Sequence, residues 1–178
     1  MNQKRIGIFP GTFDPLHAGH IAFAQRAAEV CSLEKIYLMP EKAPRLKPLV
    51  APYDSRVDII KRNIQAETIF SVLQVPAESF STQVIVPYLN ATFHSFKLVL
   101  LLGSDVLQTI HLWDGVDEIF KSFELAIGIR SDSSERQCRE IVSRLEQVCK
   151  QPISAWYINA PFSHISSTQV RARQKNTT

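Results

Sequence analysis

The chain has 178 residues, 45% of them hydrophobic and 21% charged, as in an ordinary globular protein that buries one substantial core. A formal net charge of only +3, with no long Lys/Arg run, argues against a nucleic-acid partner. Three cysteines without CxxC spacing argue against a disulfide framework or a zinc ribbon, and no apolar run suits a signal peptide or membrane span. We therefore expect one domain over residues 1–178, with reduced thiols, in the cytoplasm.

Short apolar runs alternate along the chain with segments of helical periodicity. Nearly unbroken β-branched and Leu-rich runs are typical of buried parallel strands, and here they predict strands at 5–9, 35–39, 68–72, 97–102, 124–129 and 155–158. Helical spacing predicts helices at 18–30, 54–65 and 134–150. In the segment 81–94 the pattern does not decide between a helix and a loop, because Pro87 would interrupt a helix. This alternation predicts an α/β fold with a doubly wound parallel sheet, whose ligands bind beyond the carboxyl ends of the strands.

The first predicted strand leads into a loop and a helix start that carries two histidines. The run from Gly11 to His20 reads GTFDPLHAGH. A helix N-terminus after a parallel strand offers free N–H groups and the positive end of the helix dipole to an anion. His17 and His20 share one face of the first turn, where both can bond phosphate and become charged beside a polyphosphate. Gly11 and Gly19 allow close approach of a ligand. The pattern indicates a phosphate cradle.

The same two histidines could instead cap the helix or bind a metal ion. Zinc would need a third and a fourth ligand at readable spacing, and Cys31, the nearest cysteine, stands isolated beyond the predicted helix. We therefore favour the phosphate interpretation of His17 and His20.

A second candidate motif lies far along the chain. Three consecutive hydroxyl residues, Ser166 to Thr168, precede a short helical run, so they can cap it and point amides and hydroxyls at an anion. Arg171 falls one turn later on the same side, and its fork of donors suits phosphate oxygens better than a lysine does. Taken alone, this pattern fits an ordinary N-cap with solvated arginines better than a phosphate site.

Together, residues 11–20 and 165–171 resemble the paired signatures of the HxGH nucleotidyltransferase superfamily. Within it, they are most similar to the bacterial nicotinate-mononucleotide adenylyltransferases. Supporting matches are the run 38–40 (LMP), Arg56, and the run 102–107 (LGSDVL) with Trp113. The resemblance extends from about Ile6 to Arg173 and implies a Rossmann-like nucleotidyltransferase fold in a single domain.

The resemblance implies an enzyme of NAD biosynthesis that transfers AMP from ATP to the phosphate of nicotinate or nicotinamide mononucleotide and releases pyrophosphate. The acceptor phosphate attacks the α-phosphorus, so the protein supplies alignment and charge neutralisation and needs no nucleophilic side chain. Mg²⁺ would be held mainly by the ATP phosphates, since it needs few protein ligands. The implied partners are ATP and a phosphate acceptor, with no nucleic acid and no membrane.

The resemblance also assigns roles to individual residues. The expected catalytic residues are His17, His20 and Arg171, with the histidines beside the α- and β-phosphates. The expected nucleotide-binding residues are Gly11, Thr12, Phe13, Gly19, Gly103, Asp105, Ile165, Ser166, Ser167 and Thr168. The expected acceptor-binding residues are Lys47, Ser81, Thr82 and Trp113. Several have ordinary structural alternatives: Gly103 as a turn residue, Asp105 as a helix cap, Trp113 as a core residue.

Two acceptor-side segments depart from the family pattern, and they leave the acceptor open. Residues 79–84 read SFSTQV where relatives usually carry SYTxDT, and residues 43–47 read APRLK where relatives tend to show PPHK. One alternative is a transferase of the same superfamily that acts on phosphopantetheine or a polyol phosphate. Against phosphopantetheine, that pattern has threonine at the position of His17. Another alternative is a nucleotide-binding sensor without turnover, against which the intact His17, His20 and Arg171 count.

The sequence also leaves open whether the donor is ATP or another nucleoside triphosphate. The chain stops at Thr178, where relatives usually continue through another helix. We expect this shorter end to leave the site more open or to expose a surface for self-association, so a homo-oligomer is an alternative to a monomer.

Overall fold

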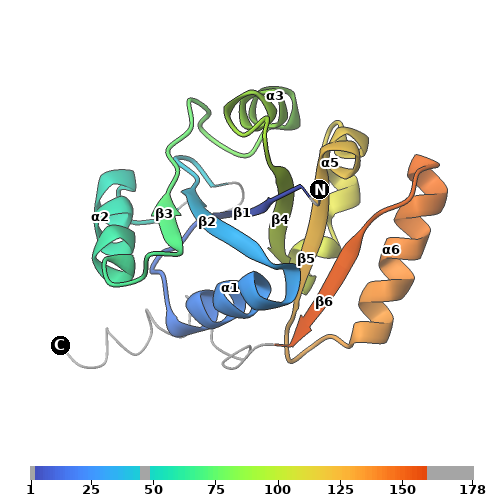
Figure 1. The fold of residues 1–178 in the computed structure, drawn as a ribbon, viewed down its shortest axis with the longest axis horizontal. Coiled ribbons are helices and arrows are strands. Elements are labelled where there is room, and N and C mark those ends of the chain that lie inside the picture. The colour runs from blue at the N-terminus through green and yellow to red at the C-terminus, as the bar shows by residue number, and fades with distance from the viewer. Residues whose placement is uncertain (1–2, 45–48, 160–178) are drawn as a thin grey trace.

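The computed structural model describes residues 3–44 and 49–159 and contains a parallel sheet between two layers of helices (Figure 1). The strands are β1 (Arg5–Gly11), β2 (Leu33–Pro40), β3 (Phe70–Val72), β4 (Lys97–Gly103), β5 (Phe123–Ile129) and β6 (Ala155–Asn159). The helices are α1 (Ala18–Cys31), α2 (Tyr53–Ile64), α3 (Thr82–Thr92), α4 (Ser104–Leu107), α5 (Val116–Ser122) and α6 (Glu135–Cys149), with a 3₁₀ turn η1 (Ile110–Leu112) after α4.

The strand order is β3-β2-β1-β4-β5-β6, and every paired neighbour is parallel. The chain moves outward from β1 to β3, then returns to the other side of β1 and continues to β6. Strand order therefore reverses between β1 and β4, which is where ligands bind in doubly wound sheets. The predicted fold class and the six predicted strands are confirmed.

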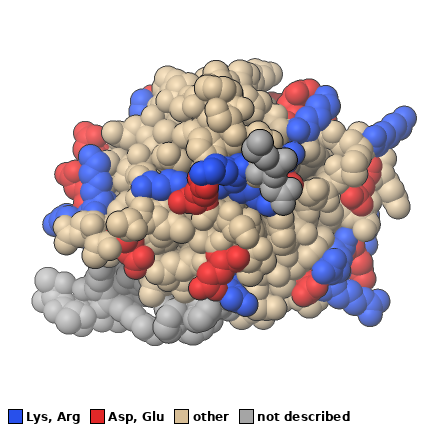
Figure 2. Space-filling model, in the orientation of Figure 1, with Lys and Arg blue, Asp and Glu red and all other residues tan. Residues whose placement is uncertain are grey.

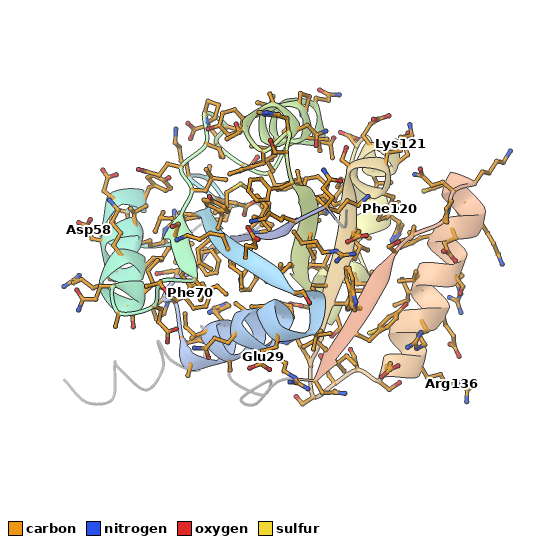
Figure 3. All side chains as sticks on the ribbon, viewed as in Figure 1. Glu29, Asp58, Phe70, Phe120, Lys121 and Arg136 are labelled. Carbon is orange, nitrogen blue, oxygen red and sulfur yellow. The ribbon has the colours of Figure 1, made fainter. Side chains whose placement is uncertain are left out.

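Each face of the sheet is covered by its own helices, because buried parallel strands are apolar on both sides. In β4, Leu98, Leu100 and Leu102 pack on one face with α3, α5 and α6. Val99 and Leu101 point to the opposite face, which α1 and α2 cover. In Figure 3, Asp58 and Arg136 project from the outer sides of α2 and α6, where both side chains are exposed.

Helix α3 continues through Pro87, where the sequence did not decide between helix and loop. A proline in a helix removes one N–H, so the carbonyl four residues earlier, that of Gln83, loses its usual donor. Gln83 and Pro87 are both exposed, so water can replace the missing bond, while Ile85 and Leu89 are fully buried on the other side. Burial of the apolar face thus outweighs one lost hydrogen bond.

Acidic and basic side chains lie next to one another on the face shown in Figure 2, in keeping with the small net charge. No helix within the described ranges combines the length and the hydropathy of a membrane span. Cys31, Cys138 and Cys149 are free thiols.

Candidate active site

A cavity of about 880 Å³ lies at the carboxyl ends of the strands, around the reversal in strand order. Its walls come from the ends of β1, β4 and β5, the start of α1, the segment after β2, and the turn around η1. It brings together nine residues predicted from the sequence: Gly11, Thr12, Phe13, His17, Gly19, His20, Gly103, Asp105 and Trp113. Six others, Lys47, Ile165, Ser166, Ser167, Thr168 and Arg171, lie outside the described residues.

His17 and His20 form a stacked pair at the start of α1. His17 is the N-cap residue, and the ring centroids are 3.7 Å apart with 30° between the planes. The backbone N–H of His17 donates to Nδ1 of His20 over 3.2 Å, the bond that a Glu or Gln makes in an ordinary capping box. Since Nδ1 of His20 is an acceptor, the proton of the neutral ring is on Nε2. His20 therefore enters the site as an Nε2–H donor.

Aromatic side chains hold the His20 ring from the protein side. The ring meets Phe13 edge to face at 5.3 Å and Phe9 at 6.0 Å between centroids. Phe13 is 2% exposed and has φ of 47°, a left-handed conformation that is costly for a residue with a Cβ. Such strain persists only where the surroundings fix it, and here the Phe13 ring also packs against Phe9 at 5.4 Å.

Burial, and to a smaller extent the positive charge of Arg130, together lower the pKa of His17 from 6.5 to about 4. With no anion bound, His17 is therefore neutral at pH 7. Its Nδ1 is buried and has no hydrogen-bond partner within the described residues. The sequence predicts that a polyphosphate can charge the His17 ring. To do so, the anion would have to overcome both the burial of the ring and the positive charge of Arg130.

We expect acid to destabilise the protein partly through His17. Its pKa is lower in the folded state than in the unfolded state, so unfolded chains bind this proton more tightly below pH 6.5. The stability from neutral His17 is complete above pH 6.5 and is lost as the pH falls towards about 4. Urea midpoints of His17→Gln should therefore fall less steeply than wild type across this window, and Arg130→Gln should raise the His17 pKa measured by NMR. Equal slopes for wild type and His17→Gln would contradict the assignment.

Gly103 and Asp105 lie close together beyond β4. A Cβ on Gly103 would collide with Oδ1 of Asp105, so only glycine leaves room for the carboxylate in this position. The N-cap of α4 is Gly103 and not Asp105, so Asp105 is not the cap of this helix. Its carboxylate is exposed at the cavity wall, where it can accept hydrogen bonds from ribose hydroxyls.

Trp113 and Phe80 both line the cavity and form an aromatic pair, with ring centroids 5.2 Å apart and 43° between the planes. Ser81 and Thr82 do not line the cavity: Ser81 is the N-cap of α3, and the Thr82 hydroxyl donates to the carbonyl of Asp114. Thr82 is buried, and this bond satisfies its hydroxyl and supports the segment that follows Trp113.

Three residues at or near the site were missed from the sequence as site residues. Arg130 lines the cavity directly after β5, a position at the carboxyl end of a parallel strand that could have indicated it. Glu41 lines the cavity after β2, and its Oε1 accepts from the N–H of Phe80 over 3.0 Å. Arg56 matches the family pattern but was not predicted as a site residue; it is 1% exposed and donates to the carbonyl of Thr12 in the first loop.

No group of three or more His, Cys, Asp or Glu residues in the described part of the chain is arranged to hold a metal ion. The carboxylates of Asp105 and Glu41 both line the cavity.

The cytidylyltransferase-like family profile matches residues 8–173 of this chain. The probable nicotinate-nucleotide adenylyltransferase of Clostridium botulinum is 30% identical over 98% of this chain and 88% of its own length. The nicotinate-nucleotide adenylyltransferase of Bacillus subtilis is 28% identical over 98% of this chain and 87% of its own. A solved structure, Plasmodium falciparum nicotinic acid mononucleotide adenylyltransferase complexed with NaAD, superimposes with a TM-score of 0.75 at 16% identity, covering 95% of this chain and 83% of that one.

Proposed function

The chain belongs to the cytidylyltransferase-like family, and on that premise we propose that it is a nicotinate-nucleotide adenylyltransferase of NAD biosynthesis. It transfers AMP from ATP to the phosphate of nicotinate mononucleotide and releases pyrophosphate. The observation that carries this proposal is the stacked pair of His17 and His20 at a helix start, in one cavity with Asp105 and Trp113.

The reaction is a single displacement at phosphorus. A phosphate oxygen of the acceptor bonds to the α-phosphorus of ATP while the bond from that phosphorus to the bridging oxygen of pyrophosphate breaks. His20 donates its Nε2–H to an oxygen on the α-phosphate, and His17 and Arg130 approach the neighbouring phosphates. Donors fixed before the reaction stabilise the charge that develops in the transition state. Asp105 accepts hydrogen bonds from the ribose, and Trp113 stacks on the pyridine ring of the acceptor.

Mg²⁺ enters with the triphosphate in this proposal. It would be held mainly by phosphate oxygens and water, with at most one or two carboxylates, of which Asp105 and Glu41 are available at the cavity wall. When bound, it neutralises charge on the phosphates. A cytoplasmic location remains a prediction from the sequence, and a homo-oligomer remains an alternative to a monomer.

Pyrophosphate release across a panel of acceptors tests the function. With ATP and Mg²⁺, the purified protein should release pyrophosphate only when a phosphorylated acceptor is added, and nicotinate mononucleotide should give the highest kcat/KM. Nicotinamide mononucleotide, phosphopantetheine and a polyol phosphate are the comparison acceptors. Turnover with only phosphopantetheine or only the polyol phosphate would show that the protein belongs to another branch of the superfamily. Binding of ATP with no turnover on any acceptor would support the sensor alternative.

We propose that Arg171, with Ser167 and Thr168, holds the phosphates that leave as pyrophosphate. Arg171→Ala should then raise KM for ATP by ~10-fold or more, since a charge-assisted paired contact is lost. Arg171→Lys should recover only part of the loss, because a point charge does not reproduce the two-pronged contact. Separate titrations of ATP and acceptor provide the measurement. A loss of affinity confined to the acceptor would mean that Arg171 lies on the acceptor side of the site and not on the ATP side.

A further inference from the structure

Arg56 joins three chain segments behind the cavity. It lies in the first turn of α2, is 1% exposed and donates to four backbone carbonyls. Its Nη1 donates to Thr12 over 2.6 Å, and its Nε donates to Ala51 over 2.9 Å. Its Nη2 donates to Glu41 over 2.8 Å and to Lys42 over 3.2 Å. One guanidinium therefore fixes the loop after β1, the segment after β2 and the segment before α2.

The shape of this contact requires arginine. A guanidinium presents five donors in a fixed plane, so it can reach carbonyls on three sides at once. Burial lowers the pKa of Arg56, and the nearby negative charge of Asp14 opposes that shift. An arginine still stays charged in proteins, and charged donors make shorter and stronger bonds than neutral donors.

The bond to Thr12 also sets the direction of the next N–H. The peptide from Thr12 to Phe13 is trans, so its carbonyl and its N–H point in opposite directions. The carbonyl points to Arg56, which does not line the cavity, whereas Thr12 and Phe13 both do. The N–H of Phe13 therefore points away from Arg56, towards the cavity side. No described residue accepts a hydrogen bond from it.

We propose that Arg56 is a positioning residue: by holding the Thr12 carbonyl, it fixes the Phe13 N–H as a donor to the charge that develops on the α-phosphate. This inference rests on the proposed adenylyl transfer. This role also explains why Phe13 keeps a left-handed φ. Arg56 holds the carbonyl of the preceding residue, and Phe9 packs against the Phe13 ring, so the strained conformation is fixed from both sides.

Arg56 also fixes the acceptor end through Glu41. While Arg56 holds the carbonyl of Glu41, the N–H of Glu41 donates to Gly11 over 3.1 Å, and the carboxylate accepts from Phe80, which packs on Trp113. In this proposal Arg56 therefore supports both the loop that contacts the α-phosphate of ATP and the segment beside the acceptor, so it helps to align the two reacting phosphates. Loss of that support should lower kcat more than it raises either KM, because misalignment affects the transition state most.

The first test compares Arg56→Met and Arg56→Lys with Arg62→Met. Arg62 is on the same helix and is exposed, and among the described residues its side chain bonds only to the carbonyl of Asp58, over 3.3 Å, so it serves as the matched control. Both Arg56 variants should lose ~10²-fold in kcat, the scale of one missing backbone-type donor, with little change in KM for ATP. Arg62→Met should match wild type. Wild-type kcat in folded Arg56→Met would overturn the proposal.

A sulfur substitution separates positioning from a general structural role. ATP with sulfur in place of either nonbridging α-phosphate oxygen exists as two diastereomers, and sulfur accepts hydrogen bonds more weakly than oxygen. The diastereomer with sulfur facing Phe13 should be slow in wild type, and this ratio of rates should shrink in Arg56→Met because the donor has already been lost. A merely structural effect would slow both diastereomers equally, and an unchanged ratio would therefore overturn the proposal.

A measurement on wild type alone keeps the inference testable if the Arg56 variants do not fold. Saturation of ¹⁵N-labelled protein with α,β-methylene-ATP should move the Phe13 amide proton downfield, as expected when it donates to a phosphate oxygen. The Phe70 amide, remote from the cavity, serves as the internal reference. If wild type transfers AMP but the Phe13 amide does not respond, the inference about Arg56 fails while the function stands. If wild type shows no transfer with any acceptor, the function itself fails.

Discussion

Replacement of His20 by alanine should lower kcat by ~10²-fold or more and weaken ATP binding far less, because the group removed acts on charge that is largest in the transition state. The geometry gives the reason. Nδ1 of His20 accepts the N–H of His17, so the ring has one fixed donor, Nε2–H, and its orientation is set by Phe9 and Phe13. Steady-state kinetics with ATP and nicotinate mononucleotide provide kcat, and titration of a nonhydrolysable ATP analogue provides the affinity.

Two further substitutions separate the capping bond of His20 from its role as a donor. The amide oxygen of His20→Asn can replace Nδ1 at the helix start, but the shorter side chain does not reach the position of Nε2. The amide of His20→Gln can place an N–H near that position. We expect His20→Asn to keep the stability of wild type and to lose turnover, and His20→Gln to keep more turnover. If His20→Asn retains turnover within a few-fold of wild type, the imidazole is only a cap.

Replacement of Trp113 by alanine should raise KM for the acceptor by ~10-fold to 10²-fold, since stacking of a ring on an aromatic side chain contributes about 1–3 kcal/mol. Trp113 lines the cavity, packs against Phe80 and is followed by Asp114, whose carbonyl accepts the bond from Thr82. KM for ATP should change little. Trp113→Phe should recover part of the loss, because a smaller aromatic face remains.

The chain offers a matched control in Trp156, its other tryptophan. Trp156 is on β6, packs against the core on the α1 side and has the Arg5 guanidinium 5.4 Å from its ring. Trp156→Phe should leave both KM values as in wild type, and acceptor should quench the fluorescence of that variant but not of Trp113→Phe. A similar rise in KM for ATP and for acceptor in Trp113→Ala would place this ring between the two substrates.

The sheet could be predicted because its strands carry a local signal. In β4 the run from Leu98 to Leu102 is apolar at every position, as a strand buried on both faces must be, and its neighbours share this pattern. Helix α3 could not be decided from its residues, because the propensity of Pro87 opposes the burial of Ile85 and Leu89. Only the packed structure determines which effect is larger.

The first loop of the site could be predicted for a similar reason, since the residues from Gly11 to His20 are continuous in the chain. Arg56 could not be assigned, because its partners are backbone carbonyls up to 44 positions away and carry no residue-specific signal. The tautomer of His20 depends on one bond at the helix start, and the pKa of His17 depends on burial and on Arg130. Neither follows from spacing alone.

The bond from the His17 N–H to Nδ1 of His20 also links turnover to local motion. Helix ends open more readily than the sheet, so fraying at the start of α1 breaks this bond while the strands remain paired. Heating should then stop turnover reversibly at a lower temperature than the one that melts the sheet. ATP bound at the helix start favours the closed form, so it should bring these two temperatures closer together.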